Sequence, residues 1–78
     1  MLDRALNHLV REIVDNPDEV SVSVVDTPRG ELIEVRVHPD DLGRVIGRQG
    51  RTAKALRTVI NALAGGRKVR VDVVDTDS

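Results

Sequence analysis

Neither cysteine nor any aromatic residue occurs among the 78 residues of the chain. Without cysteine the protein can form no disulfide framework and no thiolate metal site, and it has no thiol nucleophile. Without Phe, Tyr or Trp it cannot hold a ligand by stacking on an aromatic side chain. Packing of aliphatic side chains must stabilise the fold, and a domain of this size buries only about 60% of the surface that its unfolded chain exposes.

Long apolar runs are also absent. The 40% apolar content consists almost wholly of Val, Leu, Ile and Ala, and no run approaches the roughly 20 residues that span a bilayer. The N-terminus, Met1-Leu2-Asp3-Arg4, carries charge where a secretory signal would be apolar. We therefore expect a cytoplasmic protein with no membrane partner and a single domain over residues 1–78, of which 75–78 form a frayed polar tail.

The formal net charge of −1 conceals a strong separation of charge along the chain. Residues 43–70 contain eight of the 12 basic residues and none of the 13 acidic ones. The other four basic residues share the rest of the chain with all the acids. This distribution predicts an anion-binding segment on an acidic scaffold.

Apolar residues recur with the periods of helices and strands. Spacings of three and four predict helices from Leu2 to the Asn16-Pro17 pair and from Arg51 to the Gly65-Gly66 pair. Pro39 followed by Asp40 and Asp41 suits a helix start and predicts a short helix to about Ile46. Alternation of Val or Ile with polar residues predicts strands over residues 20–24, 33–37 and 69–73. Pro and Gly between the first two strands favour an antiparallel hairpin, and the two later helices allow a parallel crossover to the third strand. We predict an α+β fold of order α-β-β-α-α-β, with a three-stranded mixed sheet and three helices on one face.

The segment Gly47-Arg48-Gln49-Gly50 separates the last two predicted helices. Two glycines allow a sharp turn and a close approach of the backbone to a ligand. Free N–H groups at the start of the next helix suit phosphate, and Arg51, Lys54 and Arg57 share its polar side. The sequence therefore predicts a phosphate-binding edge at this loop.

The stretch from Val45 to Leu56 resembles the signature of the KH domain, in which an apolar pair precedes a Gly-x-x-Gly loop and a helix follows. The element order is that of the bacterial KH type. Within the KH domains, the Gly-Arg-Thr-Ala-Lys-Ala-Leu-Arg continuation from Gly50 to Arg57 is similar to the small bacterial RNA-binding KhpA (YlqC) family. The resemblance covers nearly the whole chain.

This resemblance implies a single-stranded RNA-binding protein without catalytic activity, metal or cofactor. It also implies a homodimer, a second partner of the larger KhpB type, and a role as an RNA chaperone or post-transcriptional regulator that affects cell shape. The loop would clamp the RNA backbone, and the bases would lie in an apolar groove lined by Ile46 and the strand from Ile33 to Val37, with Arg29 at its far side. The RNA-binding residues predicted in this way are Ile46, Gly47, Arg48, Gln49, Gly50, Arg51, Lys54, Arg57 and Arg29.

Other interpretations of these residues stay open. The cations of the last helix could form an ordinary solvated face, and Arg67, Lys68 and Arg70 are not assigned to the binding surface. A protein-interaction or dimerisation module without RNA binding is the main alternative, and duplex DNA binding is less favoured because no base-reading helix is evident. For His8 we expect a partly buried structural role, and for His38 a role in helix initiation rather than metal binding.

Overall fold

The computed structural model describes residues 2–76. Its helices are α1 (Leu2–Ile13), α2 (Leu42–Ile46) and α3 (Arg51–Ala64), and its strands are β1 (Ser21–Thr27), β2 (Gly30–Val37) and β3 (Val69–Asp75). Short 3₁₀ turns, η1 (Pro17–Glu19), η2 (Pro39–Asp41) and η3 (Arg48–Gly50), lie between them. The predicted order α-β-β-α-α-β is confirmed. The turn η1 was not predicted.

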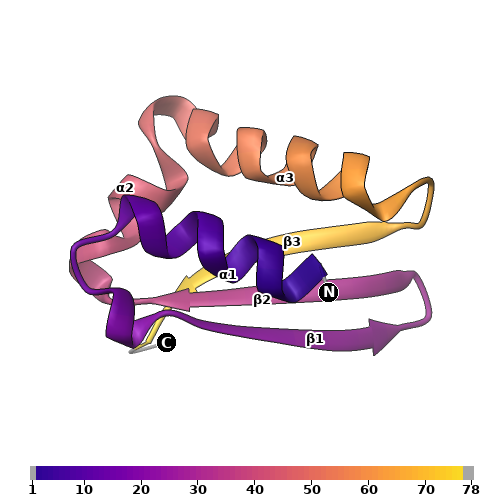
Figure 1. Cartoon of the computed structure of the whole chain (residues 1–78), viewed down its shortest axis with the longest axis horizontal. Coiled ribbons are helices and arrows are strands. Elements are labelled where there is room, and N and C mark those ends of the chain that lie inside the picture. The colour runs from indigo at the N-terminus through magenta and orange to yellow at the C-terminus, as the bar shows by residue number, and fades with distance from the viewer. Residues whose placement is uncertain (1, 77–78) are drawn as a thin grey trace.

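The three strands form one mixed sheet in the order β1-β2-β3. Strand β1 pairs antiparallel with β2, and β2 pairs parallel with β3. All three helices lie over the same face of this sheet (Figure 1). The α+β architecture predicted from the sequence is therefore confirmed, and β1 and β3 are the two edge strands.

The alternating pattern of each strand explains why only one sheet face is covered. Ile33, Val35 and Val37 of the central strand are completely buried beneath the helices. Their partners Val71 and Val73 on β3 point to the same face because paired residues share a side of the sheet. The core is completed by apolar side chains of the helices, namely Leu6, Val10, Val45, Leu56 and Ile60.

The predicted frayed tail begins too early. Asp75 is the last residue of β3 and pairs with Val37, and the N–H of Thr76 donates to the Val37 carbonyl at 2.9 Å. The central strand is long enough to give both residues a backbone partner, which a polar composition alone did not reveal. Residues 77 and 78 lie outside the described part of the chain. No helix within residues 2–76 is long and apolar enough to cross a membrane.

A buried carboxylate joins the end of α1 to the start of α2. Asp41 is only 1% exposed, and it accepts the backbone N–H groups of Asp15 (3.1 Å) and Asn16 (3.0 Å) and the Asn16 side-chain amide (3.0 Å). Burial raises the pKa of Asp41. The bonds from Asn16 and Asp15 and the charge of His38 outweigh burial, so the pKa lies below its usual value. The carboxylate thus stays ionised and fixes the segment that leads into α2.

Candidate nucleic-acid interface

The loop between α2 and α3 is a tight turn built from left-handed residues. Helix α2 ends where the N–H of Gly47 donates to the Gly43 carbonyl at 2.8 Å. Gly47 (φ 77°, ψ 174°) and Gly50 (φ 75°, ψ 15°) both have positive φ, and Gln49 between them has φ 55°. The turn places the start of α3 directly beyond the end of α2, at one end of the molecule (Figure 1).

The two glycines are required for different reasons. A Cβ on Gly47 would lie against the Oγ1 of Thr52 and 2.8 Å from its backbone nitrogen, which is closer than side chains approach. A Cβ on Gly50 would meet no protein atom within 4 Å. Gly47 therefore permits the close packing of the loop on α3, whereas Gly50 supplies only a left-handed conformation and leaves open space beside it.

We expect Gly47→Ala to destabilise the fold more than Gly50→Ala. The first change combines an unfavourable backbone conformation with a clash, and we expect a loss of about 2–3 kcal/mol. The second carries the conformational cost alone, about 1 kcal/mol. Urea denaturation followed by circular dichroism measures both free energies of unfolding, and equal losses would contradict the steric role of Gly47.

The tip of the loop faces solvent. Arg48 and Gln49 are exposed, and within residues 2–76 neither backbone N–H has a protein acceptor. Together with Arg51 these two residues line a shallow depression of about 370 Å³. Two backbone donors and two guanidinium groups are thus available to an anion at the same place.

Three cations beside the loop have no acidic partner. Arg48, Arg51 and Lys54 are exposed, and none of them forms an ion pair with another described residue. By contrast, Arg44 on α2 pairs with Asp15 at 3.1 Å. The positive charge at the loop and along the first turns of α3 is therefore not compensated locally.

Ile46 and Arg57 border the loop cations. Ile46, the last residue of α2, is 37% exposed and supplies an apolar surface next to Gly47. Arg57 lies further along α3, where its Nε donates to the Val71 carbonyl on the edge strand β3 at 3.2 Å. It shares a depression of about 400 Å³ with Arg70. Sequence reasoning left Arg70 unassigned, because periodicity does not show whether its side chain lies near Arg57 or faces away from it.

The chain is similar to known proteins. A family model described as "KhpA/KhpB, KH domain" matches residues 3–74. The chain belongs to this family. The family is non-enzymatic, in agreement with the expectation from the sequence.

Relatives within the KhpA/KhpB family are similar over nearly their full length. "RNA-binding protein KhpA" of Leifsonia xyli is 68% identical over 75 residues, which are 96% of this chain and 99% of that protein. The protein of the same name from Streptomyces coelicolor is 66% identical over 77 residues, 99% and 96% of the two chains. The one from Halalkalibacterium halodurans is 51% identical over 72 residues, 90% and 95% of the two chains.

The groove predicted beside the KH loop was placed on the wrong strand. Ile33, Val35 and Val37 were expected to line it, but all three are completely buried. Strand β2 is the central strand, so its apolar side chains form the core beneath the helices. The strand with an open edge beside α3 is β3, whose residues Val69 to Asp72 line the depression near Arg57.

Arg29 does not lie with the other predicted site residues. It occupies the β1–β2 turn and lines a depression of about 610 Å³ with Arg67 and Lys68. This end of the molecule is opposite to the loop, and the 14 residues of α3, about 21 Å of helix, separate the two. Arg67 there pairs with Glu31 at 3.1 Å. A role of Arg29 in RNA binding stays a prediction.

The two histidines differ from each other in environment. His38 Nδ1 accepts the backbone N–H of Asp40 at 3.0 Å, which agrees with the predicted role in starting the helical segment that follows. The prediction of a partly buried His8 was wrong: its side chain is 75% exposed and lies 4.0 Å from Glu12, because it is on the outer side of α1. Within the described residues, no group of three or more His, Cys, Asp or Glu side chains could hold a metal ion.

Proposed function

We propose that this chain binds single-stranded RNA by holding the sugar-phosphate backbone at the Gly47 to Gly50 loop. The observation that supports this most directly is the exposed loop tip, where two unpaired backbone N–H groups lie beside cations without carboxylate partners. The relatives named RNA-binding protein KhpA support the same ligand.

In this proposal the phosphates bind the N–H groups and guanidinium of the loop and the first turns of α3. Arg48, Arg51 and Lys54 contribute charge, and the space beside Gly50 lets a phosphate approach the backbone. Bases would pack on Ile46 and along the depression that contains Arg57. Because the chain has no aromatic residue, base stacking contributes little, and we infer modest affinity with loose sequence preference.

The wider role that we propose follows from family membership. The chain would act in the cytoplasm as an RNA chaperone or post-transcriptional regulator, and an effect on cell shape would follow from the RNAs that it binds. We also propose that it forms a homodimer or a heteromer with a KhpB-type KH protein, since a second RNA-binding domain raises a modest affinity through avidity. The shared family model covers both KhpA and KhpB.

A salt titration with a short fluorescent single-stranded RNA tests the backbone contacts. For Arg51→Gln we expect weaker binding and a decrease of about 0.7 in the slope of log K against log salt, since one phosphate contact is lost. Arg4→Gln is a matched control, because Arg4 is also an exposed arginine in a first helical turn but belongs to α1. Equal slopes for Arg51→Gln and wild type would contradict the proposed contact.

The alternative of an interaction module without RNA binding predicts a different outcome. Such a protein would show no saturable binding to the RNA at moderate salt, and Arg51→Gln would change nothing. The absence of binding in the wild type would therefore favour the alternative.

A further inference from the structure

Residues 21–25 of the edge strand β1 lack the features that usually protect such an edge, although Asp26 further along carries a charge. Residues 21–25 are Ser-Val-Ser-Val-Val, without charge and without proline, and the pairing with β2 runs through them with no bulge. Val24 is 45% exposed. Natural edge strands commonly carry charges, prolines or bulges because unpaired backbone groups bind other strands. This edge is therefore open to strand addition.

One backbone hydrogen bond shows which groups of β1 face outward. The N–H of Glu31 donates to the Lys68 carbonyl at 3.1 Å, so it points toward β3 and not toward β1. Its antiparallel partner Asp26 must then direct its own N–H and C=O away from β2, because hydrogen-bonded and non-hydrogen-bonded pairs alternate. The same alternation directs the groups of Val22 and Val24 to the free edge.

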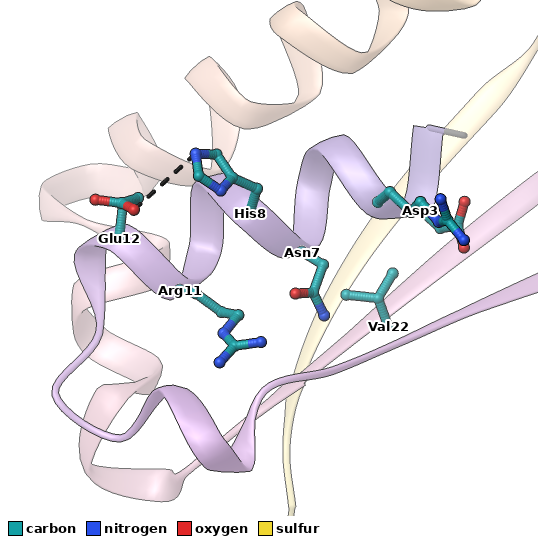
Figure 2. Close-up of a pocket in the computed structure, with 7 residues that line it drawn as sticks. Asp3, Asn7, His8, Arg11, Glu12 and Val22 are labelled. Carbon is teal, nitrogen blue, oxygen red and sulfur yellow. Dashed lines mark ion pairs between the residues drawn. The ribbon is translucent and has the colours of Figure 1, made fainter.

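A groove runs beside this edge under α1. One depression of about 310 Å³ lies between α1 and Val22, and a second of about 310 Å³ includes Leu2 and Val24, with Asp3 lining both. Figure 2 shows Asn7 and Arg11 extending from α1 on the side of Val22. A strand added to β1 would pass along this groove, and alternate side chains would face α1.

The side chains that α1 offers to such a strand favour carboxylates. Arg4 and Arg11 line the groove, lie two helical turns apart, and form no ion pair with another described residue. Asp3 and Glu31 also line it, but Glu31 pairs with Arg67 at 3.1 Å and Asp3 has an interaction of its own, so the two arginines are the charges left to a ligand. The Glu12 carboxylate lies 4.0 Å from Nε2 of His8. Both side chains project from the other side of the helix in Figure 2.

We propose that the β1 edge and the arginines of α1 form a docking site for an extended acidic peptide segment of another protein, which adds as a fourth strand. Backbone hydrogen bonds to Val22 and Val24 would supply affinity, and carboxylates at alternate positions would bind Arg4 and Arg11. This site is separate from the loop between α2 and α3, so that RNA and peptide binding can be tested independently.

The probe is a fluorescein-labelled peptide, acetyl-Thr-Glu-Val-Glu-Val-Glu-Thr-amide, with a lysine-for-glutamate version as its control. By fluorescence anisotropy we expect the acidic peptide to bind about tenfold more tightly than the lysine peptide. It should also slow amide hydrogen exchange at Val22 and Val24. Equal binding of the two peptides, or unchanged exchange at these amides, would overturn the proposal.

Two variants separate the backbone and charge contributions. Val24→Pro removes an outward donor without removing a bond to β2 and should weaken peptide binding by about tenfold or more. Arg4→Gln with Arg11→Gln should remove the preference for the acidic peptide and leave RNA affinity unchanged. If instead the wild type sediments as a dimer that Val24→Pro dissociates, a second copy occupies the edge and the proposed occupant is wrong.

Discussion

Replacing Arg48 and Gln49 together by aspartate is expected to weaken RNA binding by at least about 100-fold while the fold is retained. The change removes one cation and places two carboxylates where the phosphates would lie, so attraction becomes repulsion. Both side chains are exposed, and neither forms a hydrogen bond or ion pair with another residue in the range 2–76. Aspartate also tolerates the left-handed conformation of Gln49 (φ 55°).

Fluorescence anisotropy with the same short RNA measures this effect, and circular dichroism checks the fold. Arg4→Asp is the control, because it makes the same charge change as Arg48→Asp at an exposed arginine of α1, outside the proposed RNA-binding surface. A comparable loss in the control would mean that net charge matters and not the loop. Unchanged affinity of the double variant would refute the loop assignment.

The sequence predicted the loop and the order of elements because both depend on local signals. The change from helical to strand period, together with the breaks at Gly47, Gly50 and the Gly65-Gly66 pair, is sufficient to define helices and strands. The sharp turn was predicted because glycine can adopt conformations that other residues avoid. Gly47 and Gly50 do have positive φ in the structure. Even the parallel pairing of β2 with β3 followed from the two helices that connect them.

How far the helices cover the sheet could not be predicted in the same way. The hairpin and the crossover make β2 the central strand, and alternation shows that Ile33, Val35 and Val37 share a face, but neither shows that this face is wholly buried. Arg29 was predicted at the far side of the groove, and the structure places its hairpin at the end of the sheet opposite to the loop. Distances of this kind between segments far apart in sequence are not encoded by periodicity.

The second large effect is expected at Asp41, which the sequence indicated only as part of a helix start. Asp41→Ala would leave three part-buried donors without their acceptor, namely the backbone N–H groups of Asp15 and Asn16 and the Asn16 side-chain amide. The link between the end of α1 and the start of α2 would be lost. We expect the melting temperature to fall on the order of 10–15 °C for this variant, and less for Asp41→Asn, which keeps one acceptor oxygen.

Asp40→Asn is the control for this residue, because Asp40 is the neighbouring aspartate and its side chain is 86% exposed. Its melting temperature should stay within about 2 °C of the wild type. A fall of less than about 2 °C for Asp41→Ala would contradict the role of the buried carboxylate.

The dependence on pH gives a further signature of the Asp41 carboxylate. The pKa of Asp41 is lower in the folded protein than in the unfolded chain, where it is about 3.9. The carboxylate therefore contributes fully to stability above the unfolded pKa, and this contribution is lost as the pH falls through the folded pKa. The difference in melting temperature between wild type and Asp41→Asn should therefore be largest near pH 6 and shrink below pH 4. Melting curves followed by circular dichroism from pH 6 to pH 2 measure this difference, and a gap that stays constant would show that the charge of Asp41 does not stabilise the joint between α1 and α2.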